Sequence, residues 1–144
     1  VLGDVPDRER KTSNGFQLAL PVLFTSGIQH LVTTPEQMEP MPEFVKGYLR
    51  ELPAQWDEIE FLEGFPGRYI VIARRAGKRW YVAGINAEAG TRVLELDLGF
   101  TGASKGRLIT DGSDWRQPAT TEFNTDEARV TLPHGTGFVM ILNP

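Results

Sequence analysis

The sequence contains no cysteine and only two histidines among its 144 residues. The missing cysteines exclude disulfide bonds, thiolate zinc sites and cysteine nucleophiles. The chain also lacks a Walker loop and the G-x-G-x-x-G fingerprint of dinucleotide-binding proteins. From the residues alone we therefore predict no catalytic residue, no metal ligand and no cofactor site in this chain.

Neither sign of charge dominates, because 15 Lys and Arg stand against 19 Asp and Glu, for a net charge of -4. This balance argues against nucleic acid and anionic membranes as partners. No Asp, Glu, Lys or Arg occurs from Thr12 to Pro35, yet the apolar centre of that stretch covers only residues 18–24 and contains Pro21. A spanning helix needs about 20 apolar residues, so we expect neither a membrane span nor a signal peptide.

The composition changes near residue 55. Six of the ten prolines precede it, whereas eleven of the fifteen glycines follow it. This shift predicts a helical segment over residues 1–55 and an antiparallel β-sandwich over residues 56–144. A hydrophobic content of 40% suffices for a folded core. The chain begins with Val rather than Met, and we expect it to be trimmed or excised from a longer protein.

The first part of the chain reads as helices separated by prolines. The run from Phe16 to Phe24 is apolar on nearly all sides, which predicts a helix buried all round, with a kink or break at Pro21. We expect a short helical turn over residues 28–32. A capping-box pattern predicts a further helix from Pro35, and the apolar spacing over residues 42–52 is typical of an amphipathic helix.

From residue 57 the hydrophobic period becomes two, which is typical of β-strands. Alternating segments separated by turn residues predict about eight short strands, at 57–63, 68–75, 79–86, 91–98, 105–110, 119–124, 128–133 and 137–142. The second and third of these strands are apolar on both faces. We therefore expect one of their faces to form the sandwich core and the other to pack against the helices of residues 12–52.

Several polar clusters invite a chemical interpretation. An acidic cluster consists of Asp57, Glu58, Glu60 and Glu63. It could supply paired carboxylates, but charged residues are also typical of an edge strand.

The remaining groups fit structural roles. The two histidines, His30 and His134, lack ligand-spaced partners. A group of Asp and Asn residues lacks the spacing of a calcium loop; it consists of Asp111, Asp114, Asn124 and Asp126. A basic group fits a solvated hairpin tip; it consists of Arg74, Arg75, Lys78 and Arg79.

The three tryptophans are candidate stacking platforms for sugar rings. Trp80 lies within an apolar strand and fits the core, whereas Trp115 lies in a polar turn that ends at Pro118. We predict Trp115 as the possible sugar contact, which would make the chain a carbohydrate-binding module. A protein-interaction β-sandwich is a further alternative.

Two stretches carry a family resemblance. The first is Gln17-Leu18-Ala19-Leu20 through Phe24-Thr25-Ser26, with Ile28-Gln29-His30-Leu31 and Thr34-Pro35-Glu36. The second is Leu52-Pro53-Ala54-Gln55-Trp56-Asp57-Glu58, which continues into Gly67-Arg68-Tyr69-Ile70-Val71-Ile72-Ala73-Arg74-Arg75 and Trp80-Tyr81-Val82-Ala83-Gly84-Ile85-Asn86. Together they resemble the last barrel helix and the C-terminal β-domain of glycoside hydrolase family 97.

The resemblance implies that this chain is the C-terminal, non-catalytic portion of an α-glucosidase or α-galactosidase. Its partner would be the enzyme's own (β/α)8 barrel, and the catalytic and calcium-binding carboxylates would lie in parts that are absent here. The resemblance also implies a periplasmic or extracellular parent. Calcium is thus expected for the parent enzyme and not for this chain.

Overall fold

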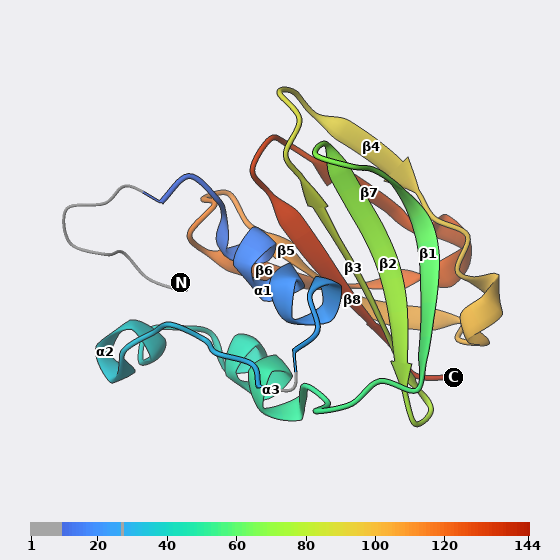
Figure 1. Cartoon of the computed structure of the whole chain (residues 1–144), viewed down its shortest axis with the longest axis horizontal. Helices are drawn as coiled ribbons and strands as arrows, with labels where there is room; N and C mark the ends of the chain where they lie inside the picture. Colours follow the sequence, from blue (N-terminus) through green and yellow to red (C-terminus); the bar gives the residue numbers. More distant parts are fainter. Residues whose placement is uncertain (1–9, 27) are drawn as a thin grey trace.

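A computed structural model describes residues 10–26 and 28–144 of the chain. Eight strands form two antiparallel sheets, with the helices preceding them (Figure 1). The larger sheet has the strand order β1-β2-β3-β8-β5-β6, and β4 pairs with β7 in the smaller one. The strands are β1 (Glu58–Phe65), β2 (Tyr69–Ala76), β3 (Arg79–Asn86), β4 (Arg92–Glu95), β5 (Lys105–Asp111), β6 (Pro118–Asn124), β7 (Arg129–Leu132) and β8 (Gly137–Leu142).

This arrangement confirms the predicted fold class, a mainly β sandwich preceded by helices. The division of the chain at residues 55 and 56 stays a prediction, because the helices and the large sheet share one hydrophobic core. Short 3-10 turns at η1 (Gly99–Thr101) and η2 (Thr125–Glu127) lie in the connections. No helix among the described residues is long and apolar enough to cross a membrane.

The large sheet is covered on both faces, as its two-sided apolar strands predict. On one face Trp80 and Val82 of β3 pack with β4 and β7. On the other face Tyr81, Ala83 and Ile85 pack with the helices. The sheet is therefore the middle layer of three, and the prediction that residues 12–52 cover one face is confirmed.

Helix α1 (Asn14–Leu23) lies directly on the large sheet, where it contacts β3, β8 and β5. The Ser13 hydroxyl accepts a hydrogen bond from the Phe16 amide and so caps the helix. Close approach depends on glycine at the crossing. A side chain at Gly15 would be driven into the carbonyl of Gly137, and one at Gly137 would lie 2.7 Å from the Phe16 Cα.

Three expectations about this segment are wrong: a break at Pro21, burial of the helix on all sides and a helical turn over residues 28–32. Helix α1 runs through Pro21 without a break, and it is not buried all round, because Leu20 is half-buried and Phe24 is 61% exposed. Helix α1 covers one face of the sheet, but the side of the helix that points away from the sheet is only partly covered by other residues. Residues 28–32 form no helix. Their side chains are exposed, so no packing offsets the cost of nucleating a short helix.

The other helices follow their sequence signals. Helix α2 (Pro35–Met38) carries the predicted capping box between Thr34 and Gln37. Helix α3 (Glu43–Glu51) buries Val45 and Tyr48, and the Tyr48 hydroxyl donates a 2.8 Å hydrogen bond to the Leu18 carbonyl of α1. Burial raises the pKa of Tyr48, so its proton stays in this bond. Helix α3 is thereby fixed to α1 as well as to the sheet.

Candidate functional site

Three members of the acidic cluster lie on β1, an edge strand of the large sheet, and Asp57 directly precedes it. Glu58 forms an ion pair with Arg75 at 2.8 Å, and Asp57 lies 3.8 Å from the same guanidinium. Glu63 accepts a hydrogen bond from the Tyr69 hydroxyl. These contacts favour the edge-strand interpretation over paired catalytic carboxylates.

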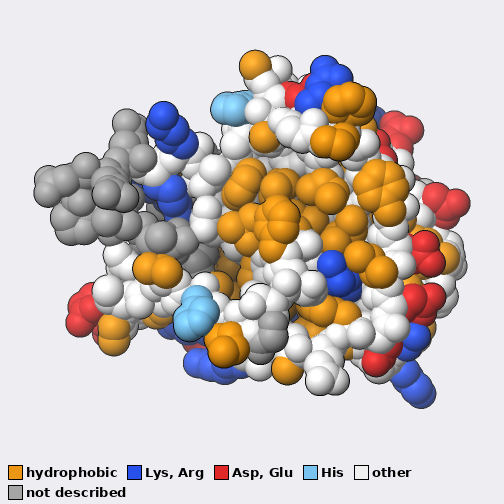
Figure 2. Space-filling model, viewed as in Figure 1, with side chains coloured by type: hydrophobic (Ala, Val, Ile, Leu, Met, Phe, Trp, Pro, Cys, Tyr) orange, Lys and Arg blue, Asp and Glu red, His pale blue; other side chains and the backbone are white. Residues whose placement is uncertain are grey.

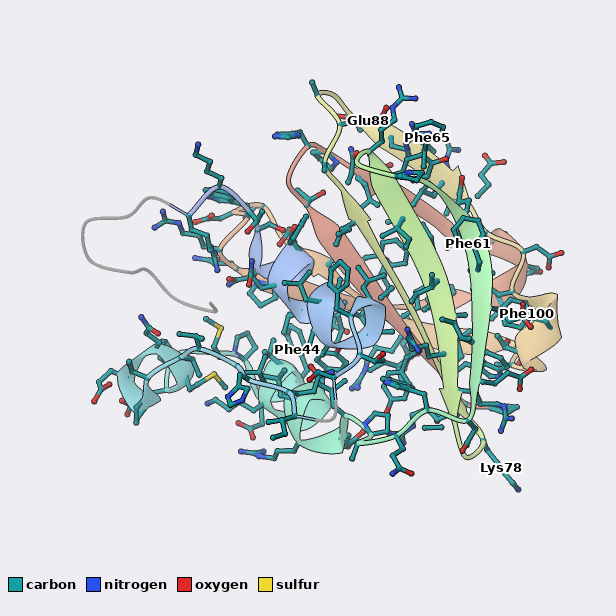
Figure 3. The ribbon with its side chains drawn as sticks, in the orientation of Figure 1. Phe44, Phe61, Phe65, Lys78, Glu88 and Phe100 are labelled. Carbon is teal, nitrogen blue, oxygen red and sulfur yellow. The ribbon has the colours of Figure 1, made fainter. Side chains whose placement is uncertain are left out.

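The basic residues of the β2–β3 hairpin are mostly engaged with the protein itself. Arg74 donates a 2.7 Å hydrogen bond to the Val22 carbonyl at the end of α1. Arg79 pairs with Glu51 of α3 at 2.7 Å and also binds Asn143. Lys78 is exposed at the hairpin tip (Figure 3). Three of these four cations, counting Arg75, therefore hold structural contacts, which agrees with the prediction of a hairpin rather than a nucleic-acid platform.

The candidate metal ligands are not brought together. Asp111 and Asn124 lie at opposite ends of the β5–β6 hairpin, where they pair with Pro118 and Lys105, respectively. His30 is exposed after α1, and His134 is exposed in the β7–β8 turn, where its Nδ1 lies 2.8 Å from the Glu88 carbonyl oxygen. Within residues 10–26 and 28–144, no three His, Asp or Glu side chains form a group that could hold a metal ion.

Asp111 has a structural role that the sequence did not reveal. Its carboxylate accepts a 2.8 Å hydrogen bond from the Gly15 amide in the first turn of α1. The Asn14 amide donates to the Trp115 carbonyl at 2.8 Å, and the Ser13 amide donates to the Gly135 carbonyl at 2.9 Å. Burial raises the pKa of Asp111, although bonds from Ser13 and Gly15 oppose the shift. The start of α1 is thereby fixed to the β5–β6 and β7–β8 turns.

One motif escaped the reading of the sequence, which had found no G-x-S-x-G elbow of the kind that carries a hydrolase nucleophile. The run Gly102-Ala103-Ser104-Lys105-Gly106 matches this pattern. An elbow requires a sharp turn from a strand into a helix. Ser104 instead follows the 3-10 turn η1 and leads into strand β5. Its carbonyl accepts a hydrogen bond from the Thr125 amide. The context of the motif therefore does not fit a nucleophile.

The tryptophans occupy three different environments. Trp80 is buried in the core under β4 and β7, and Trp56 packs edge-on against Tyr81 at a centroid distance of 5.4 Å. Trp115 is half-buried, and the Arg116 guanidinium lies 5.8 Å from the centre of its ring. The role of Trp115 in sugar binding stays a prediction.

A feature that the sequence did not single out is an apolar groove at one end of the helix-covered face. Phe24 from the end of α1 borders it on one side, and Phe61 and Phe65 of β1 border it on the other. Ile70 of β2 and Ile85 of β3 also line it. We call this surface the β1–β2 groove. Figure 2 shows the apolar side chains gathered at the centre of this face.

The groove is open because α1 ends before it reaches β1. Phe61 is 63% exposed and Phe65 is 57% exposed, and Figure 3 shows Phe61 along β1 and Phe65 next to the turn into β2. The pairing of β1 with β2 shifts register between Phe61 and Glu63, so the ladder is irregular between the two rings. Among the described lining residues, Arg68 and Tyr69 carry the ionisable groups, and Arg68 is paired with Glu88. The groove is therefore mostly apolar, and the charge of Arg68 at its border is balanced by Glu88.

Comparison with known proteins gives the chain its relatives. The family model described as "Glycosyl-hydrolase 97 C-terminal, oligomerisation" matches residues 55–143. A probable retaining alpha-galactosidase of Streptomyces bingchenggensis is 41% identical over 110 residues, which are 76% of this chain and 17% of that protein. A retaining alpha-galactosidase of Bacteroides thetaiotaomicron is 43% identical over 86 residues, which are 60% of this chain and 13% of that protein.

Solved structures extend the likeness to the helical segment. The crystal structure of a beta-arabinopyranosidase covers 92% of this chain with a TM-score of 0.83 and 30% identity, and the match spans 21% of that chain. A putative alpha-N-acetylgalactosaminidase from Bacillus halodurans matches 99% of this chain at 13% identity with a TM-score of 0.57, which shows the fold alone. The chain thus spans about a fifth or less of the length of these two galactosidases and of the arabinopyranosidase.

Proposed function

Because the chain belongs to the C-terminal domain family of glycoside hydrolase family 97, we propose that it is the non-catalytic C-terminal portion of an α-glycoside hydrolase. In this proposal it supports the catalytic barrel of the parent enzyme, which this chain does not contain. The two curated relatives are named retaining alpha-galactosidases, which favours an α-galactoside over an α-glucoside as the parent's substrate. The periplasmic or extracellular location implied by the family resemblance stays a prediction.

The exposed apolar segment that follows α1 is the observation that carries this proposal. Phe24, Ile28, Leu31 and Val32 are all exposed and lie close together in the chain. Phe24, Leu31 and Val32 line one shallow hollow together with Leu20. A soluble domain rarely leaves so many large apolar side chains together in water, and such patches mark interaction surfaces. We assign this segment, which lies outside the matched residues 55–143, to contact with the catalytic part.

Calcium does not fit the described residues of this chain. The ion takes six to eight oxygen ligands, whereas no group of three carboxylate or imidazole side chains occurs among these residues. We place the calcium ligands of the parent in its catalytic part, as the family resemblance implies. We expect neither added calcium nor a chelator to change the melting temperature of this chain.

The test compares the full-length parent with variants of the exposed segment. Leu31→Asp and Val32→Asp place charges in the proposed contact, and we expect each to lower the melting temperature of the full-length enzyme while leaving that of the isolated chain unchanged. Val93→Asp is the matched control, because Val93 is also exposed on the surface but lies on β4. Equal melting temperatures for all three full-length variants and the unmodified enzyme would contradict the proposed contact.

The isolated chain provides the second part of the test. We expect it to release no nitrophenol from aryl α-galactosides or aryl α-glucosides, with or without calcium, because we find no pair of carboxyl groups placed for acid and base within residues 10–26 and 28–144. Hydrolysis that is abolished by Glu58→Gln or Glu60→Gln would overturn the non-catalytic assignment. Binding of galactosides that is lost in Trp115→Ala would instead favour the carbohydrate-binding alternative.

A further inference from the structure

We propose that Asn14 is a deamidation site that the fold keeps closed, so that it reacts only when the first turn of α1 opens. Asn14 is followed by Gly15, and no other Asn-Gly pair occurs in the chain. Glycine has no Cβ to hinder an attack on the preceding side chain, and asparagine is among the thermolabile residues. The inference concerns the chemistry of this chain and does not rest on the proposed function.

The reaction consumes only water and releases ammonia. The Gly15 amide nitrogen gives up its proton and attacks the Cγ atom of Asn14. A C–N bond forms, the side-chain nitrogen leaves as ammonia, and a cyclic succinimide results. Water then adds to one of the two ring carbonyls and opens the ring. Residue 14 becomes aspartate or isoaspartate, and in the latter the main chain runs through the former side chain.

The folded structure holds both reacting groups away from this path. The Gly15 amide donates a 2.8 Å hydrogen bond to the Asp111 carboxylate, so its proton is already engaged. The Asn14 side-chain oxygen accepts a 2.7 Å bond from the Arg10 guanidinium, and its side-chain nitrogen donates to the Arg116 carbonyl. Asn14 is also the first residue of α1, and ring closure requires it to leave helical backbone angles.

Burial adds to this protection. Asn14 is only 2% exposed, and its own amide donates a 2.8 Å bond to the Trp115 carbonyl. The water that opens the ring therefore has little access to the site in the folded chain. Because the bonds to Arg116, Trp115 and Asp111 all join this turn to the β5–β6 connection, one local opening must break them together.

Either product would weaken the docking of α1. Aspartate replaces the nitrogen that donates to the Arg116 carbonyl by an oxygen that cannot donate, at a buried position. Isoaspartate lengthens the main chain next to Gly15, where the helix crosses closely over Gly137. Each opening that ends in deamidation therefore loosens the cover of the sheet irreversibly.

The experiment follows the reaction at Asn14 during incubation in mildly alkaline buffer, by intact mass and by peptide mapping. We expect the unmodified chain to react about 100-fold or more faster in guanidinium chloride than when folded. Asp111→Ala removes the acceptor of the Gly15 proton and should accelerate the reaction of the folded chain by about 10-fold. Ser13→Ala removes the cap of α1 and is a milder second variant with the same expected direction.

Val130→Ala is the control for a general loss of stability. Val130 is buried between the two sheets, in the core on the side of the large sheet away from α1. Its truncation should lower the stability of the chain but leave the rate at Asn14 unchanged, because the first turn of α1 opens on its own. Circular dichroism identifies any variant that fails to fold.

Each result decides the proposal. Faster reaction in folded Asp111→Ala or Ser13→Ala, with Val130→Ala unaffected, supports it. Equal rates in the folded and the denatured chain overturn it, as does a chain that does not react even in denaturant. An equal acceleration in Val130→Ala also overturns it, because the reaction then proceeds through unfolding of the whole chain. Asn14→Asp carries one product from the start and should melt below the unmodified chain, and equal melting temperatures would overturn the predicted loss of docking.

Discussion

The two ends of one sheet face differ in whether anything covers them. Over β3, β8 and β5 the face is closed, because α1 lies against the strands and buries residues such as Ala19 and Val22 completely. Over β1 and the adjoining end of β2 near the turn the same face is open, and Phe61 remains mostly exposed, whereas Ile72 in the middle of β2 is buried with the helices. The strands of both ends belong to one continuous sheet.

The length of α1 explains the difference. A helix of 10 residues is about 15 Å long, whereas six strands spaced about 4.8 Å apart extend over about 24 Å. One short helix therefore cannot cover the whole sheet. The closed end makes the chain stable, whereas the open end leaves an apolar surface exposed. The two ends of the same face thus contribute unequally to stability.

The largest effect should come from breaking the closed end at Gly15. Gly15→Ala drives a methyl group into the Gly137 carbonyl and should lower the free energy of unfolding by about 3 kcal/mol. Gly47→Ala is the matched control in α3, where nothing lies within 4 Å of the new methyl group. It should raise stability by about 0.5 to 1 kcal/mol. Urea unfolding of both variants measures the difference, and equal stabilities would refute the close crossing of α1.

A smaller loss is expected where the closed end meets the open end. Arg74 of β2 donates to the Val22 carbonyl and so satisfies the C-terminus of α1. Arg74→Met should cost about 1 kcal/mol in urea unfolding, because the bond is partly exposed to solvent. The control is Arg129→Met, since Arg129 and its exposed partner Glu95 are 4.0 Å apart. A loss as large in the control would contradict a specific role for Arg74.

The Asp111 anchor of α1 predicts a pH dependence. Burial raises the pKa of Asp111 above the ordinary value of 3.8, so the folded state holds this proton more tightly than the unfolded state. The contribution of Asp111 to stability is therefore largest below pH 3.8 and falls as the pH rises through the folded pKa. The stability of the unmodified chain relative to Asp111→Asn should fall over that range. The stability difference between the unmodified chain and Gly47→Ala should not depend on pH. If the difference between the unmodified chain and Asp111→Asn is equally independent of pH, this account is contradicted.

The smallest effect should appear at the open end. Phe61→Ser removes a mostly exposed ring, so the unfolding free energy of the chain should change by less than about 0.5 kcal/mol. Thermal and urea unfolding would measure it. A loss approaching that of Gly15→Ala would mean that the groove is part of the core.

The layered fold could be predicted because its signal is local. Trp80 and Val82 alternate with Tyr81 and Ala83, and an apolar residue on both faces of a strand requires cover on both sides. The error at residues 28–32 has the opposite cause. Ile28 and Val32 suggested a packed helical turn, but both side chains are mostly exposed.

The β1–β2 groove could not be predicted, because it depends on contacts between distant segments. Phe61 lies in an alternating acidic and apolar strand, which the sequence presents as an ordinary edge. Phe24 reaches the groove only because α1 continues through Pro21. The anchoring role of Asp111 likewise joins residues 96 positions apart. Such pairings follow from the packing of the helix on the sheet, which no single segment encodes.

Hydrogen exchange of the unmodified chain tests the central comparison most directly. Amides of α1 and β8 should exchange slowly, because the closed end is protected by packing of the helix on the sheet. Amides of β1 should exchange markedly faster, because its apolar side chains at the open end remain exposed. Equal protection of β1 and β8 would contradict the account.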